Sequence, residues 1–180
     1  TLASTLQRLP VGKRAALGAA LLAHAEDAND PFLPYLVWYG ISPLAKDDPQ
    51  ALVALAKDCT WPKTLRWMAR SLATQPEALN ALLAQAKAEQ AETILEGMAD
   101  AFKGIRKAVK PEAWDGFVKL AAGAPEPASS SAKATKDEKA GTTIPNQAET
   151  KLNAQQMIQE LSILFGDGRA LDDVKKLALD

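Results

Sequence analysis

The chain contains 180 residues, of which 47% are hydrophobic and 24% are charged, and its formal net charge is −1. The apolar residues are mainly Ala and Leu, with few β-branched or aromatic side chains, and this composition favours helix over strand. Because the charges nearly cancel, the chain has no general basic field. Neither nucleic acid nor an acidic membrane surface is therefore expected as its principal partner.

Cys59 is the only cysteine. A single thiol excludes an internal disulfide, and within this chain it also excludes a paired-cysteine metal site and a Cys-x-x-Cys-His haem-attachment motif. No apolar run approaches the roughly 20 residues that a membrane-spanning helix needs, so membrane insertion is not expected. No cofactor or metal site is predicted in this segment.

The most apolar stretch, residues 30–46, reads DPFLPYLVWYGISPLAK. Asp30 and Pro31 predict a helix start, because the carboxylate can accept hydrogen bonds from free backbone N–H groups and a proline at the first helical position loses no bond. Pro43 predicts a kink or break over residues 40–43, since it lacks an N–H and its ring crowds the carbonyl four residues back. The aromatic side chains are expected in the core, and Trp38 is expected to be largely buried.

Other helices are predicted from the spacing of apolar residues and from helix-start signals over 2–9, 11–26, 49–57, 62–73, 76–88, 90–103 and 111–122. Helices of about a dozen residues joined by short turns, five of them introduced by an Xaa-Pro pair, are typical of stacked antiparallel helix pairs. The sequence therefore predicts an all-α fold arranged as a HEAT-like α-solenoid. The spacing between the starts is uneven, which leaves a compact helical bundle as the alternative architecture.

Composition changes abruptly at Gly123, after which large apolar residues almost disappear. Such a segment cannot bury enough surface to offset its ordering entropy, so residues 123–151 are predicted to be a flexible linker. Two helices, 153–165 and 169–179, are predicted beyond it. The resulting organisation is a helical domain over 1–122, the linker, and a C-terminal helical hairpin over 152–180 that packs on or continues the helical domain.

Three features of the sequence hint at chemistry and are better explained structurally. His24 lacks partners at metal-ligand or general-base spacing and is predicted to be a solvated or half-buried histidine at a helix end. Cys59 has no second cysteine or histidine nearby and is predicted to be a packed, inert thiol. The run Gly166-Asp167-Gly168-Arg169 lacks the alternating acids of a calcium loop and the Gly-Lys-Ser/Thr of a phosphate loop, so a tight inter-helix turn is predicted.

Four residues are candidates for binding a partner: Arg66, Arg70, Trp38 and Tyr39. Arg66 and Arg70 are four residues apart and project from one side of a helix, where two guanidinium groups could grip a carboxylate, a phosphate or a partner domain. Trp38 and Tyr39 could form a platform for a ligand. The structural alternative is a solvated helix face with Trp67 in the core and with the aromatic residues of 30–46 packed inside.

Residues 30–44 (DPFLPYLVWYGISPL), the helix containing Leu65-Arg66-Trp67-Met68-Ala69-Arg70, and the run LFGDGRAL over 164–171 together carry a resemblance. They resemble the helical region of large secreted planctomycete and verrucomicrobial proteins of the membrane-bound dehydrogenase-like, haem-binding type. In that family a sorbosone-dehydrogenase-like β-propeller precedes a HEAT-like region, and a c-type cytochrome domain follows it. The resemblance implies an extracytoplasmic or periplasmic location and haem c in the parent protein. The present chain has neither a Cys-x-x-Cys-His motif nor a β-rich portion, so no haem or dehydrogenase chemistry is expected on its own residues.

The first functional hypothesis is a non-catalytic helical-repeat scaffold or spacer of such a parent protein, which positions neighbouring domains or docks another protein. The alternative is a stand-alone protein- or peptide-binding module. That alternative predicts an exposed groove lined by residues such as Arg66 and Arg70, and it loses its main support if both are held in internal ion pairs. An isolated enzyme is not expected, because no catalytic constellation is present.

Overall fold

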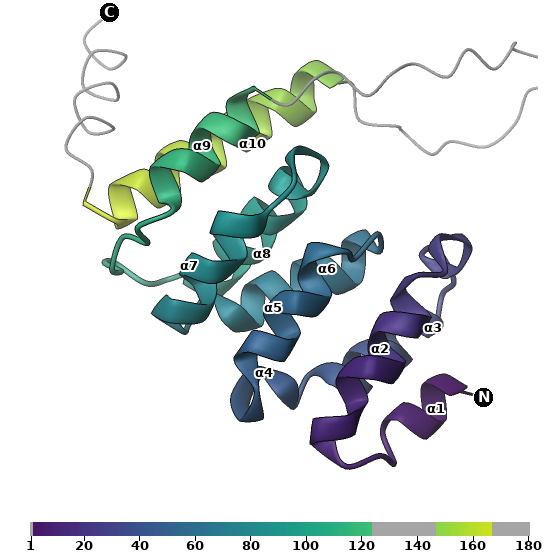
Figure 1. The fold of residues 1–180 in the computed structure, drawn as a ribbon. Helices are drawn as coiled ribbons and strands as arrows, with labels where there is room; N and C mark the ends of the chain where they lie inside the picture. The colour runs from purple at the N-terminus through teal and green to yellow at the C-terminus, as the bar shows by residue number, and fades with distance from the viewer. Residues whose placement is uncertain (1, 124–146, 167–180) are drawn as a thin grey trace, which may run out of the picture.

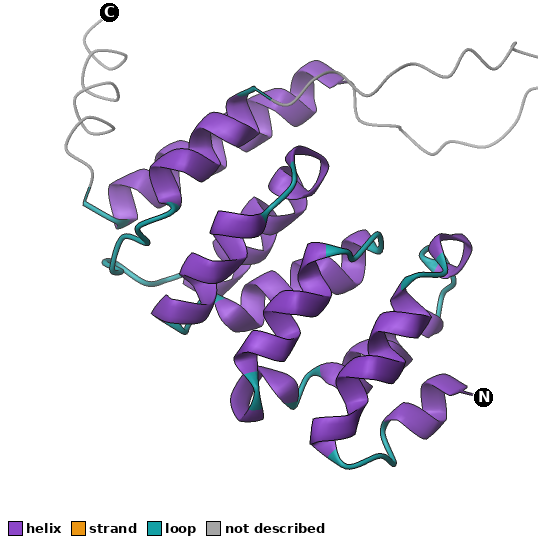
Figure 2. Ribbon diagram, in the orientation of Figure 1, coloured by secondary structure: helices purple, strands orange, loops and turns teal. Residues whose placement is uncertain are grey.

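A computed structural model describes residues 2–123 and 147–166, and in these ranges the chain is helical without any strand (Figures 1 and 2). The prediction of an all-α fold is therefore confirmed. Three short 3₁₀ turns, η1 (Val11–Lys13), η2 (Ala25–Asp27) and η3 (Ala88–Gln90), connect α-helices. The α-helices are α1 (Leu2–Leu6), α2 (Arg14–Leu22), α3 (Leu33–Ile41), α4 (Leu44–Asp47), α5 (Pro49–Lys57), α6 (Pro62–Leu72), α7 (Pro76–Gln85), α8 (Ala91–Phe102), α9 (Trp114–Ala122) and α10 (Gln147–Leu164).

Prolines begin three of the helices as predicted, at Pro49, Pro62 and Pro76. The helix expected from Pro111 begins three residues later, at Trp114, whose N–H donates to the Pro111 carbonyl at 3.1 Å. A turn therefore occupies the first residues of that predicted helix.

The aromatic stretch begins with Asp30 as a hydrogen-bond acceptor, as predicted. Its carboxylate accepts from the N–H groups of Phe32 and Leu33, each at 2.8 Å. The α-helix itself starts at Leu33, so Pro31 precedes it and is not at the first helical position. The predicted break is present, because α3 ends at Ile41 and α4 begins at Leu44.

The helices lie in two rows, and the chain changes direction each time it crosses between them (Figure 1). Contacts along the first row join α2 to α5, α5 to α7 and α7 to α9. Contacts along the second row join α1 to α3, α3 to α6, α6 to α8 and α8 to α10, with the most extensive interface between α6 and α8. The buried apolar residues lie between the rows in one cluster, which includes Val37, Met68 and Ile94.

Three glutamine side chains between residues 75 and 90 bond the preceding helices α4 and α5. Each donates through its Nε2 to backbone carbonyls in or just after an earlier helix, α4 for Gln75 and α5 for Gln85 and Gln90. The bonds run from Gln75 to Ala45 (2.6 Å), from Gln85 to Val53 (2.5 Å), and from Gln90 to Ala56, Lys57 and Cys59 (3.0, 3.2 and 3.2 Å). Polar groups are thus satisfied between pairs as well as within them.

The second row ends with α10, which packs against α8 and α9. The ring of Phe165 meets Trp114 and Phe102 edge-on, with centroids 5.1 and 5.7 Å away, and the Trp114 indole N–H donates to Ser162 Oγ at 3.2 Å. The helix begins at Gln147, inside the range predicted as linker and six residues before the predicted start at 153. Residues 124–146 and the predicted second helix of the hairpin, 169–179, lie outside the described residues.

Candidate interaction surface

His24 and Cys59 have the surroundings that their sequence context predicts. His24 is exposed just after α2, and its Nδ1 lies 3.0 Å from Glu26 Oε1; the hydrogen bond and the charge of Glu26 raise the histidine pKa. Cys59 is buried, and desolvation raises the pKa of its thiol to about 11, so the reactive thiolate is disfavoured at neutral pH. Among the described residues, no three His, Cys, Asp or Glu side chains gather in a way that could hold a metal ion.

Gly166 is the only residue of the predicted 166–169 turn that the structure describes. It has a φ of +77°, the left-handed conformation that glycine adopts readily, and its N–H donates to the Ile163 carbonyl at 2.9 Å. This backbone closes α10, in agreement with a helix-ending role for the first glycine.

An aromatic ridge is exposed on α3 and the residue before it. Phe32, Tyr35 and Tyr39 are 71%, 45% and 61% exposed, and their spacing places them on one side of the helix. Val37 and Ile41, on the opposite side, are fully buried. We call these three residues the aromatic ridge; within the described parts of the chain, every aromatic side chain classed as exposed belongs to it.

Trp38 and Trp67 form the seam between α3 and α6. Both are half-buried, with ring centroids 6.1 Å apart, and the Tyr35 ring lies 4.9 Å from that of Trp67. Trp38 is therefore less buried than predicted, and Trp67 lies at the edge of the core instead of inside it. The two indoles support the ridge from the side that faces α6.

Arg66 and Arg70, predicted to act as a pair, have different partners. Arg66 Nε donates to Asp100 Oδ2 at 2.7 Å and its Nη1 to Glu96 Oε2 at 3.0 Å, which raises the arginine pKa and lowers that of Asp100. Arg70 is exposed and makes no hydrogen bond or ion pair with any described residue, although its charge contributes to lowering the Asp100 pKa. The condition that weakens the binding hypothesis thus applies to Arg66 and does not apply to Arg70.

The charges on this row are sorted by helix. Neither α3 nor α6 contains an acidic residue, and α6 carries Lys63 as well as the two arginines. In contrast, α8 carries Glu92, Glu96 and Asp100 and has no basic residue. Partial burial and the charge of Glu96 raise the pKa of Glu92. The surface is therefore cationic beside the aromatic ridge and anionic one helix further along.

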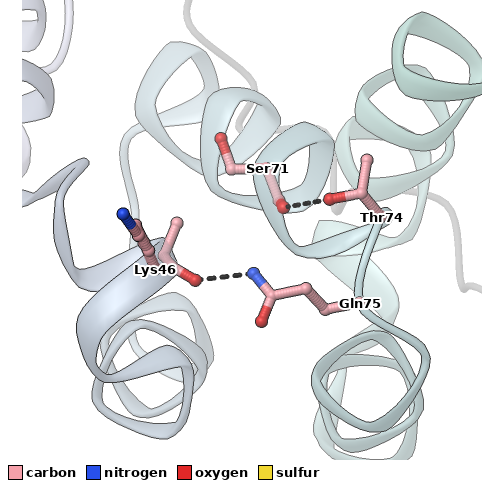
Figure 3. Close-up of a pocket in the computed structure, with 5 residues that line it drawn as sticks. Lys46, Ser71, Thr74 and Gln75 are labelled. Atoms are coloured by element: carbon pink, nitrogen blue, oxygen red, sulfur yellow. Dashed lines mark hydrogen bonds between the residues drawn. The ribbon is translucent and has the colours of Figure 1, made fainter.

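Two of the hollows in the described part of the molecule are lined partly by polar side chains. One, of about 450 Å³, lies between α4 and the turn after α6 and is lined by Ala45, Lys46, Ser71, Thr74 and Gln75 (Figure 3). Two of its polar side chains already bond backbone, Gln75 to the Ala45 carbonyl and Thr74 Oγ1 to the Ser71 carbonyl at 3.2 Å. The other, of about 300 Å³, is lined by Arg66, Glu96 and Asp100 together with residues of α10 such as Gln156 and Glu160. Neither hollow contains a nucleophile activated by a base.

Sequence reasoning named Tyr39 and Arg70 and missed Phe32 and Tyr35. The signal that could have found these two is helical spacing, because positions 32, 35 and 39 share a side while the apolar positions 37 and 41 occupy the other. The expectation that aromatic residues in an apolar helix pack inside holds for neither Phe32 nor Tyr35, because one side of α3 stays open to solvent.

The fold and the surface together define an all-helical protein with an exposed aromatic and cationic face. Comparison with known proteins finds no matching family model, no matching curated protein and no matching solved structure. Among the helices that the structure describes, none is both long and apolar enough to cross a membrane.

Proposed function

We propose that this chain is a non-catalytic helical-repeat scaffold that docks a protein partner, or a neighbouring domain of a longer chain, on the aromatic ridge. The observation that carries the proposal is the exposure of Phe32, Tyr35 and Tyr39 on one side of α3. In this proposal the helix pairs are irregular HEAT-like repeats, and the stacking of the helices in two rows (Figure 1) supports that interpretation.

Aromatic surface that stays in contact with water on the ridge does not contribute its hydrophobic free energy to folding. A buried aromatic side chain removes 150–250 Å² from water, at roughly 25 cal/mol per Å², so leaving three such side chains in solvent forgoes several kcal/mol. Tyrosine is also enriched where proteins meet, because its ring is apolar and its hydroxyl can bond at the rim. The three aromatic side chains that α3 and the residue before it expose are of the residue types enriched at the centre of protein–protein interfaces.

The family resemblance supplies a context for the scaffold. In a parent protein of that type, the ridge would contact an adjacent β-propeller or cytochrome domain in an extracytoplasmic compartment, and any haem c would belong to that domain. A stand-alone peptide-binding module is the second candidate, favoured by Arg70 on the neighbouring helix α6, which is exposed and makes no ion pair with any described residue.

The test uses random 12-residue peptides displayed on phage and selected on the purified chain. We expect selected peptides whose affinity falls at least tenfold, which corresponds to about 1.4 kcal/mol, in the Tyr35→Ala/Tyr39→Ala double variant. The matched control is Val109→Ser, which removes another exposed apolar side chain, 75% exposed, away from the ridge. Peptides that bind the double variant as tightly as the original chain, or a selection without binders, would contradict the proposal.

A further inference from the structure

From the charge sorting beside the ridge, we infer that the partner presents a carboxylate, Asp or Glu, next to the apolar side chains that cover the aromatic ridge, and that Arg70 binds this carboxylate. The inference rests on the proposed function and names the chemistry of the partner. In the second row, α6 lies between α3 and α8.

The side chains of α6 divide between its two neighbours. Trp67 turns toward α3, where it meets Tyr35, and Arg66 turns toward α8, where it meets Glu96 and Asp100. Lys63 and Arg70 are seven residues apart, nearly two helical turns, and both are exposed between these directions. The two cations therefore occupy the solvent-facing centre of α6.

The basic side chains of α6 differ in whether nearby carboxylates neutralise their charge. The Arg66 guanidinium forms ion pairs with two carboxylates, which neutralise its positive charge locally, so it attracts an anionic partner only weakly. Arg70 and Lys63 make no ion pair with any described residue. Because α3 contains no acidic residue, no carboxylate of that helix offsets the charges of Lys63 and Arg70 on the ridge side of α6.

The carboxylates of α8 fix where an anionic group of the partner can bind. Glu92, Glu96 and Asp100 repel a second carboxylate on their side of α6, and Glu160 adds to the negative charge where α10 follows. A partner carboxylate is thus favoured on the α3 side of Arg70, toward the aromatic ridge. A guanidinium can hold it with two parallel hydrogen bonds, which gives direction to the bound segment.

The residues favour a peptide segment over a nucleic acid. A phosphate backbone would place successive negative charges across the row, and beyond α6 it would meet the acidic helix α8. A peptide with one carboxylate could bind Arg70 through that carboxylate. The apolar or aromatic side chains next to the carboxylate would then cover the aromatic ridge, which lies on one side of α6 only.

The experiment compares matched arginine variants on the same phage-displayed 12-residue peptides. The original chain is expected to enrich Asp or Glu over Lys or Arg, and Arg70→Gln is expected to weaken the selected peptides at least tenfold. Arg66→Gln is the matched control: it should change affinity less than threefold while lowering the melting temperature, whereas Arg70→Gln, which removes no hydrogen bond to a described residue, should lower the melting temperature less than Arg66→Gln does. In Arg70→Glu, the selection should shift toward Lys and Arg.

The outcomes separate the two proposals. Peptides that depend on Tyr35 and Tyr39 but show neither acidic enrichment nor a response to Arg70→Gln would overturn the carboxylate inference and leave the docking function standing. Absence of any binder that depends on those tyrosines would overturn both. A fluorescein-labelled 12-residue oligothymidylate serves as the nucleic-acid arm, and its binding through Arg70 as tightly as the selected peptides would also overturn the inference.

Discussion

Asp100 holds α6 to α8 through Arg66, and this residue makes the stability depend on pH. The hydrogen bond from Arg66 lowers the Asp100 pKa below its ordinary value of 3.8, so the folded state favours the ionised carboxylate. A lowered folded pKa means that the stabilisation is complete above the unfolded pKa and is lost as pH falls through the folded pKa.

Replacing this carboxylate tests the pair directly. Because Arg66 and Asp100 are about 40% exposed, we expect Asp100→Asn to lower the free energy of unfolding at pH 7 by about 0.5–1 kcal/mol. The difference from the original chain should shrink as pH falls below 3.8, as measured by urea unfolding at several pH values. The control Asp47→Asn, at an exposed carboxylate without a described partner, should change stability little at any pH. If the free energy of unfolding of Asp100→Asn were lower than that of the original chain by the same amount at every pH, this explanation would be wrong.

Gln90 is a second residue whose effect can be measured. It is 6% exposed, and its amide donates to three carbonyls at the end of α5 while its Oε1 accepts from the Lys87 N–H at 3.2 Å. Gln90→Ala removes the side-chain donor from these carbonyls, of which only that of Ala56 is also known to accept from a backbone N–H, that of Cys59, so we expect a loss of about 1–3 kcal/mol in thermal or urea unfolding. Gln50→Ala, on the exposed side of α5, should stay within about 0.5 kcal/mol of the original chain. Equal effects of the two substitutions would show that the Gln90 bonds contribute nothing specific.

The sequence predicted single residues well where their partners are close along the chain. The role of Asp30 follows from the two or three residues after it, and the inert thiol of Cys59 follows from the absence of reactive neighbours. The ion pairs of Arg66 join residues 30 and 34 positions apart, and these depend on which helices meet. Local spacing therefore gives Arg66 and Arg70 the same predicted role, because only the packing of α6 against α8 distinguishes them.

At the scale of elements, Gly97 permits the close approach of α6 and α8. A Cβ at this position would lie 2.5 Å from the Arg66 carbonyl oxygen and 2.7 Å from the Ala69 Cβ, so α6 and α8 could not keep their separation. We expect Gly97→Ala to cost about 1–3 kcal/mol in chemical unfolding, despite the better helix propensity of alanine. In the matched variant Gly116→Ala on α9, a Cβ meets nothing within 4 Å, and stability should rise by up to about 1 kcal/mol. Stabilisation by both substitutions would disprove the close-packing argument.

Helix starts were predictable where proline directly begins the helix, and less so where a turn intervenes. Pro49, Pro62 and Pro76 fit because a fixed φ and a missing N–H suit the first turn. Pro111 is followed by a turn instead, and the Ala113 N–H donates to Asn80 Oδ1 of α7 at 2.8 Å. A side chain more than 30 residues away thus helps to set where α9 begins, which local patterns do not contain.

For the whole molecule, the two rows predict uneven local stability. The α6–α8 interface lies in the middle of the second row and is the most extensive one, whereas α1 is a five-residue helix at the end. Central elements that open only with the rest of the molecule exchange their amide hydrogens slowly. We expect hydrogen exchange followed by mass spectrometry to be slowest in α6 and α8 and fastest in α1. Uniform protection along the described helices would indicate a single cooperative unit and contradict this expectation.

The bonds from Gln75, Gln85 and Gln90 also have a consequence for the order of biosynthesis. In each case the donor lies about 30 residues downstream of the carbonyl it serves. At about 5–20 residues per second, a ribosome needs roughly two to six seconds to supply that donor. Until then these carbonyls lack the glutamine donor, so the hydrogen bonds that join the earlier helices to the later ones form only after the glutamines have left the exit tunnel. Translation pauses placed within a pair should therefore prolong the exposure of the preceding one to proteases and chaperones.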